Sequence, residues 1–243
     1  MEGLTSGAVW AAFGAIVVAN ILLSGDNAVV IAMAARSLPP TQQKRAIFWG
    51  SAAAIVMRIV LTLAAVQMLQ LPYLKLVGAL LLLWIGVQLL LDTEQAGELK
   101  AEGTMIAAIR TILVADLVMS LDNVIAVAGA ADRAPEAYRL PLLVAGLAMS
   151  IPLIIVGSTL LMKVMERFPI IITLGAALLG WIAGEMLASD PALEEWIQAN
   201  VAHAELIFGV VGAALVVVVG RSLHHHRQTR VGQALEPRHN SSH

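Results

Sequence analysis

Apolar stretches, each close to or longer than the ~20 residues that cross a bilayer as a helix, occupy most of the 243-residue chain. Seven can be delimited, at residues 8–35, 46–70, 72–91, 104–131, 139–163, 169–188 and 204–220. Inside a membrane each must be helical, because a strand edge or loop exposed to lipid would leave backbone groups without hydrogen bonds. Only 13% of the residues are charged and the mean hydropathy is +0.83. The sequence therefore predicts an all-α, polytopic membrane protein with seven transmembrane helices.

The basic residues predict the orientation of these helices, because cytoplasmic loops carry an excess of Lys and Arg. With the amino terminus outside, inner segments hold 11 of the 15 basic residues, outer segments hold Lys75, Arg133 and Arg139, and Arg58 lies within a span. This split favours an external amino terminus and a cytoplasmic carboxyl terminus. The chain has no cysteine and a net charge of −2, so disulfides and thiolate metal sites are excluded and no nucleic-acid partner is indicated.

A polar block occurs twice within the apolar sequence, as Ser24-Gly25-Asp26-Asn27 and again as Ser120-Leu121-Asp122-Asn123. At offsets of 96 or 97 residues, further matches pair Pro39, Gly50, Pro72, Gly78 and Trp84 with Pro135, Gly146, Pro169, Gly175 and Trp181. Each unit then holds three spans, and an odd number inverts the second unit, as in many transporters. The predicted organisation is a first repeat at 1–92, a cytoplasmic linker at 93–103, a second repeat at 104–190, an external loop and seventh helix at 191–220, and a cytoplasmic tail at 221–243.

The acidic residues of the spans are candidate ligands, because an ionisable group at membrane depth costs roughly 3 kcal/mol to insert. Inversion brings Asp26 level with Asp116 and Asn20 level with Asp122, in two layers about 9 Å apart on an unbroken helix. The spans contain no His or Cys, and carboxylate and amide oxygens suit Mg²⁺, Ca²⁺ or Mn²⁺. The candidate metal ligands are Asn20, Asp26, Asn27, Asp116, Asp122 and Asn123.

Three questions about this site stay open at the level of sequence. Either ions occupy two positions stepped along the helices, or the helices unwind locally at the two blocks. Gly25 favours unwinding in the first block, and Leu121 disfavours it in the second. The aspartates are ligands, or they only form hydrogen bonds that hold helices together. Met33 and Met119 either add a soft thioether that favours Mn²⁺ or fill the core.

Arg58 lies near the middle of the second span, and its repeat counterpart is Ile154. A buried Arg needs a carboxylate partner, and Asp26, Asp116 and Asp122 are the candidates. Arg58 then either neutralises the acidic site or forms a fixed structural ion pair. Glu185, near the outer end of the sixth span, is either an external gate ligand or an interfacial side chain. The stretch His224-His225-His226 reads as a metal ligand set or as part of a basic anchor for anionic lipid.

The blocks Leu23-Ser24-Gly25-Asp26-Asn27-Ala28 and Ser120-Leu121-Asp122-Asn123-Val124, on seven apolar spans, resemble the TerC family of bacterial membrane proteins, and the first block resembles its YjbE-type branch. The resemblance covers about residues 10–220. It implies manganese efflux, tellurium resistance by name, a relationship to LysE-type transporters, and a place in the bacterial plasma (inner) membrane. It also implies a metal site at Asp26, Asn27, Asp116, Asp122 and Asn123. Other branches have an acidic residue where this chain has Asn20, which lowers the charge of the implied site.

The leading functional prediction is a secondary transporter that exports a divalent cation, Mn²⁺ above others, as its substrate. No P-loop is present, so the driving force is the membrane potential, the metal gradient or proton exchange. The alternatives are a membrane scaffold or metal-delivery partner for exported proteins, and an intramembrane aspartyl protease, whose Gly-x-Gly-Asp pattern neither block provides. We expect no enzymatic activity and no organic cofactor; the partners are the metal ion and the lipid bilayer, and a homo-oligomer is compatible with the pattern.

Overall fold

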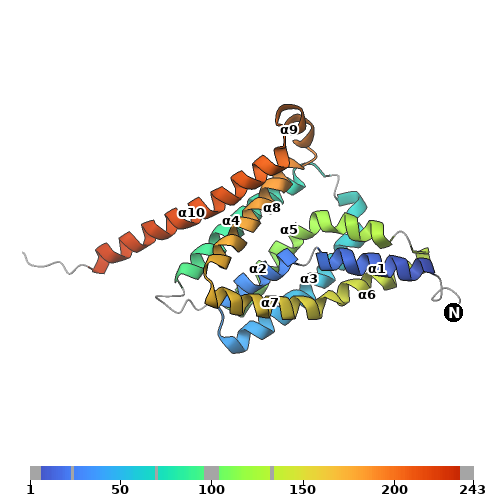
Figure 1. The fold of residues 1–243 in the computed structure, drawn as a ribbon, viewed down its shortest axis with the longest axis horizontal. Helices are drawn as coiled ribbons and strands as arrows, with labels where there is room; N and C mark the ends of the chain where they lie inside the picture. The colour runs from blue at the N-terminus through green and yellow to red at the C-terminus, as the bar shows by residue number, and fades with distance from the viewer. Residues whose placement is uncertain (1–6, 23–24, 69–70, 96–103, 132–133, 236–243) are drawn as a thin grey trace, which may run out of the picture.

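The computed structural model describes residues 7–22, 25–68, 71–95, 104–131 and 134–235, and within these ranges the regular structure is helical (Figure 1). The helices are α1 (Gly7–Leu22), α2 (Gly25–Arg36), α3 (Pro40–Met68), α4 (Leu74–Gln95), α5 (Met105–Ala131), α6 (Glu136–Ala148), α7 (Ser150–Arg167), α8 (Ile170–Ala188), α9 (Glu194–Asn200) and α10 (Ala204–Leu235). The predicted all-α class is confirmed.

Within the described residues, five helical segments are long and apolar enough to cross a membrane. They are Pro40–Thr62, Leu74–Leu91, Glu136–Arg167, Ile170–Ala188 and Ala204–Leu223, and they match the second, third, fifth, sixth and seventh predicted spans. The first and fourth predicted spans are also helical, as α1 with α2 and as α5, but they are not among the five. The polytopic membrane architecture is thus confirmed, and the count of seven remains a prediction. Large apolar side chains such as Trp84 and Val156 are more than half exposed, as expected of a surface that faces lipid.

The two polar blocks have different backbone structures. The described part of the first, Gly25, Asp26 and Asn27, lies in the first turn of α2, whereas the second lies inside the continuous helix α5. Ser24 lies outside the described residues, so the unwinding expected at the first block stays a prediction.

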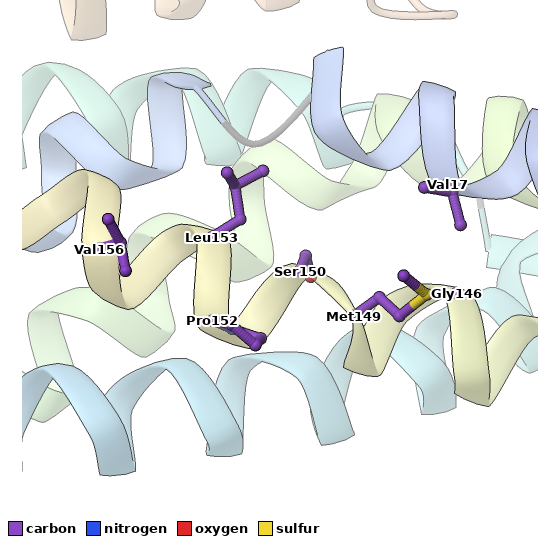
Figure 2. Close-up of a pocket in the computed structure, with 7 residues that line it drawn as sticks. All are labelled: Val17, Gly146, Met149, Ser150, Pro152, Leu153 and Val156. Carbon is purple, nitrogen blue, oxygen red and sulfur yellow. The ribbon is translucent and has the colours of Figure 1, made fainter.

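The fifth predicted span is also divided, into α6 and α7, at Met149. Pro152 in the first turn of α7 has no N–H to continue the hydrogen-bond ladder of α6, which explains the break. Figure 2 shows Met149, Ser150 and Pro152 at this junction, where they line a pocket of about 410 Å³ together with Val17 of α1.

Glycines let α8 and α10 pack backbone against backbone. A Cβ added at Gly184 would lie 2.0 Å from the carbonyl oxygen of Phe208, and one added at Gly180 would lie 2.3 Å from that of Gly212. Small residues at such spacing allow close approach of membrane helices. Helix α4 packs on the same pair, and α10 continues beyond both (Figure 1).

Helices α3 and α5 lie side by side and run in the same direction, an arrangement that positions the buried polar groups. Gly50 of α3 packs against Ile112 of α5, and farther along both helices Arg58 contacts Asp116 and Ser120. Helix α2 packs on both of them. The three helices α2, α3 and α5 therefore meet at one buried junction.

Candidate ion site at the junction of α2, α3 and α5

Arg58 forms the centre of the junction and is only 2% exposed. Its Nη2 group donates a hydrogen bond to Asp116 Oδ1 within an ion pair, and its Nε group donates to Ser120 Oγ at 3.0 Å. The Ser120 hydroxyl donates in turn to Asp116 Oδ2 at 3.3 Å. Asp116 and Ser120 are four residues apart on α5, so they share one helix face, and a single guanidinium from α3 can bridge both.

Asp26 approaches the same junction from the first turn of α2. Its Oδ1 accepts a hydrogen bond from the backbone N–H of Asn27 at 2.8 Å, and its carboxylate interacts electrostatically with both Arg58 and Asp116. The positive end of the α2 dipole favours a negative charge at this position. Asp26 of α2 and Asp116 of α5 therefore both lie within electrostatic range of Arg58 on α3, and Asp116 contacts it directly. Among the side chains that the structure describes, Asp116 forms an ion pair with Arg58; the side chain of Asp122, another of the three predicted partners, lies outside them.

The other predicted ligands are placed less completely. Asn27 is buried at the start of α2, and Asn123 is half-buried on α5. Asn20 and Asp122 lie in the helices α1 and α5, but their side chains are outside the described part of the structure. Among the side chains that are described, no group of three or more His, Cys, Asp or Glu gathers as a metal cluster. Asp26 and Asp116 are the two carboxylates that the described junction offers.

The chemistry of the junction is that of oxygen ligands. Carboxylate, amide and hydroxyl oxygens are suited to hard or borderline divalent cations, which take six or more oxygens. Met33 and Met119 are both nearly fully buried and belong to the main apolar core, where their side chains fill space between helices. Their role as ion ligands stays a prediction.

Sequence reasoning missed a polar stripe along α3. Ser51, Arg58 and Thr62 lie on one face of the helix and are all buried. The Thr62 hydroxyl donates to the backbone carbonyl of Arg58 at 2.7 Å, whereas Ser51 Oγ has no hydrogen-bond partner among the described residues. The spacing of these residues could have revealed the stripe, because Ser51 and Arg58 are seven residues apart and Arg58 and Thr62 are four apart, and both separations keep side chains on one helix face.

A second buried carboxylate, Asp190, was not among the site residues predicted from sequence. It is fully buried after α8, and it accepts hydrogen bonds from the backbone N–H groups of Tyr73 and Leu76 at 3.0 Å and of Ala192 at 2.8 Å. Burial alone raises the pKa of this carboxyl, but the backbone N–H donors together outweigh it and hold the pKa below its usual value. Asp190 therefore caps the start of α4 and ties it to the end of α8.

Two further predicted features have specific outcomes. The Glu185 carboxylate accepts a hydrogen bond from Trp181 Nε1 at 2.7 Å, one turn away on α8, and its role as a gate ligand remains a prediction. His224, His225 and His226 continue helix α10, and their side chains lie outside the described residues. The orientation of the termini is likewise still a prediction.

Comparison with known proteins places this arrangement in a family. Residues 5–228 match the family described as Integral membrane protein TerC family. The chain is 42% identical to the Uncharacterized membrane protein YjbE of Bacillus subtilis over 199 residues, which cover 82% of this chain and 88% of the relative. It is 28% identical to YceF of the same organism over 54% of this chain and 55% of that protein. It is 24% identical to the inner membrane protein YoaE of Escherichia coli, over 94% of this chain and 46% of that protein. No solved structure matches. The chain belongs to the TerC family of integral membrane proteins.

Proposed function

We propose that this TerC-family protein is a secondary transporter that exports a divalent cation, Mn²⁺ above others, by way of Asp26 and Asp116. The observation that carries the proposal is the convergence of these two acids, from different helices, on one junction within apolar sequence. Ionisable side chains inside membrane-spanning segments are rare and commonly mark ion pathways. The preference for Mn²⁺ and the outward direction come from the family resemblance.

The predicted inverted repeats are part of this proposal, and the helix packing supports them. Gly50 packs against Ile112, and Gly146 packs against Ile16. An offset of 96 residues turns one pair into the other, because it relates Gly50 to Gly146 and Ile16 to Ile112. Two halves related in this way would place the shared cation between them, and rocking of one half against the other would expose it to each side in turn.

Amide side chains and a second layer add possible ligands for a cation. Asn27 and Asn123 would add amide oxygens, and Asp122 and Asn20 a second layer.

A pocket near the junction supplies a candidate entrance. It has a volume of about 130 Å³ and lies among α2, α4 and α5, where Ser37, Gln88, Thr104 and Thr111 give it polar groups. Thr111 precedes Asp116 by five residues on α5, which corresponds to about 7.5 Å along the helix. Five residues also correspond to about 140° around the helix, so Thr111 and Asp116 lie on different sides of α5, and a cation would have to pass between helices to reach the carboxylates.

The test is metal uptake into proteoliposomes that contain purified wild-type protein or the variants Asp26→Asn and Asp116→Asn. Mn²⁺, Ca²⁺ and Mg²⁺ are compared with a metal-sensitive dye inside the vesicles. Glu185→Gln is the matched control, because it also neutralises a carboxylate in the α8 span but leaves an oxygen for Trp181. Each variant is first checked for a monodisperse elution profile and a melting transition.

We expect Mn²⁺ uptake by wild type and by Glu185→Gln, and at least a ~10-fold loss in both site variants, equivalent to about 1.4 kcal/mol. Normal Mn²⁺ flux in both folded site variants would overturn the assignment of the site. A folded wild-type protein that moves none of the three ions would overturn transport itself and favour the metal-delivery alternative.

A further inference from the structure

Met33 is a buried side chain of α2 that borders the pocket among α2, α4 and α5. Three residues of α2 line this pocket, namely Met33, Ala34 and Ser37, and Met33 is the one nearest to Asp26 in the sequence. Its side chain is only 4% exposed and extends toward α8, where a Cβ added at Gly175 would lie 2.8 Å from its sulfur. Met33 therefore fills the space between α2 and α8 beside the pocket.

The register of α2 places Met33 between the pocket and Asp26. Successive separations of four, three and four residues put one stripe of side chains on a single face of the helix, formed by Asp26, Val30, Met33 and Ser37. Ser37 lines the pocket, whereas Asp26 lies about 10.5 Å from Met33 along the helix axis, at the junction of α2, α3 and α5. The stripe on α2 thus leads from the pocket to Asp26 by way of Met33.

The pocket side of α5 does not lead to Asp116 in the same way. Thr111 lines the pocket, and one turn farther along the same face Ala115 is apolar and fully buried. Asp116 follows Ala115 by one residue and so points about 100° away from that face. A cation that leaves the pocket along the stripe of α2 therefore meets Asp26 before Asp116.

Met33 is the member of this stripe whose side chain can move aside. A methionine side chain is unbranched and has three rotatable bonds, whereas the β-branched Val30 has few rotamers in a helix. Gly175 leaves room for the thioether on α8, because any Cβ at that position would overlap it. An ion is strongly disfavoured in an apolar layer without water or oxygen ligands, so a cation cannot cross while Met33 fills this space.

We propose that Met33 is the gate between the pocket and Asp26. In this structure the gate is closed, and rotation of the Met33 side chain away from Gly175 opens the way for a cation to Asp26. The volume of the side chain, and not its sulfur, closes the path. This inference rests on the proposed function, because it concerns the entry of the transported cation.

The test uses the absence of native cysteine. Asp26→Cys reports access to the junction and Thr111→Cys reports access to the pocket, each in the full-length protein in sealed membrane vesicles. Because Asp26 is only half-buried, an impermeant sulfonated maleimide is added solely on the face from which Thr111→Cys reacts. The rate of modification is followed by mass spectrometry for each reporter with native Met33, with Met33→Leu and with Met33→Ala.

With native Met33, Asp26→Cys should react at least about 10-fold more slowly than Thr111→Cys. Met33→Ala leaves space where the gate was and should speed the reaction of Asp26→Cys at least about 10-fold, with Thr111→Cys changed less than about 2-fold. Met33→Leu conserves the volume, so both rates should stay within about 2-fold of those with methionine. Met33→Val, a milder truncation, should give a rise of about 3-fold and decides the question if Met33→Ala does not fold.

An Asp26→Cys rate that changes with neither Met33→Ala nor Met33→Val would overturn the gate, and so would a Thr111→Cys protein that reacts from neither face. A folded Met33→Leu protein with native Asp26 that loses Mn²⁺ uptake at least about 10-fold would make the sulfur a ligand and overturn a gate that acts by volume. The proposed function fails separately, and only if folded Asp26→Asn and Asp116→Asn proteins transport Mn²⁺ like wild type. The labelling rates do not depend on that result.

Discussion

Replacement of Asp190 by alanine should loosen the junction between α4 and α8. The substitution leaves three backbone N–H groups, those of Tyr73, Leu76 and Ala192, without their acceptor at a position that is fully buried. An unsatisfied buried donor costs about 1–3 kcal/mol, and water will reach some of the three because they lie at a helix end, so we expect a total of about 3 kcal/mol. For a chain of this size, 1 kcal/mol corresponds to a shift of about 2–4 °C, which gives a decrease of about 6–12 °C in Tm.

The five tryptophans of the chain allow the melting transition to be followed by intrinsic fluorescence in detergent. Glu195→Ala, which removes an exposed acid from the neighbouring helix α9, is the matched control and should shift the Tm by less than about 1–2 °C. A Tm for Asp190→Ala within about 1 °C of wild type would refute the reasoning, because the three donors would then not depend on this carboxylate.

The same carboxylate predicts a pH dependence with a defined sign. Its pKa in the folded protein lies below the ordinary Asp value of about 3.9, so folding favours its charged form. The stabilisation is therefore complete above about pH 4 and is lost as the pH falls through the lower folded value. The Tm difference between wild type and Asp190→Ala should be constant from pH 8 to 6 and should shrink toward pH 3. A difference that grows on acidification would contradict the assignment.

Three further predictions address packing, coupling and the ion pair. Gly184→Leu should destabilise the protein, because its Cβ would lie 2.0 Å from the Phe208 carbonyl oxygen, whereas Gly14→Leu, with no atom within 4 Å, should change the Tm little in the same fluorescence assay. If the protein exchanges metal for protons, an imposed pH gradient should change the initial rate of Mn²⁺ uptake into proteoliposomes. An initial rate that does not depend on the gradient would exclude proton exchange. Asp116→Asn should lower the free energy of unfolding by about 3–5 kcal/mol, because it leaves Arg58 buried without its carboxylate. Adding Arg58→Gln should recover part of this loss. If the losses of the two single variants instead add up in urea or thermal unfolding, the two residues are not a coupled pair.

The apolar stretches sufficed to predict helices, because in a membrane the hydrophobic length and the need for internal backbone hydrogen bonds leave few alternatives. The division of the fifth span at Met149 was not predicted, although Pro152 carried a signal for it. A single proline in a transmembrane helix is often tolerated, so its presence alone does not locate a break.

The composition of the junction could be predicted only in part. Sequence identified Asp26, Arg58 and Asp116, but the partner of Arg58 depends on how α3 and α5 are rotated against each other, which their packing decides. Ser51 and Asp190 were missed for a related reason. One serine in an apolar helix and one aspartate in a loop belong to no repeated pattern, and their burial arises only when distant helices assemble.

The most direct test of the central claim, that Asp26 and Asp116 share one divalent cation, uses the absence of native cysteine. The double variant Asp26→Cys and Asp116→Cys, and each single variant, are treated with Cd²⁺ and then with a small maleimide, and the modified thiols are counted by mass spectrometry. We predict that micromolar Cd²⁺ protects both thiols of the double variant and neither single variant, because thiolates from α2 and α5 would bridge one ion. Equal modification of the double variant with and without Cd²⁺ would contradict a shared site.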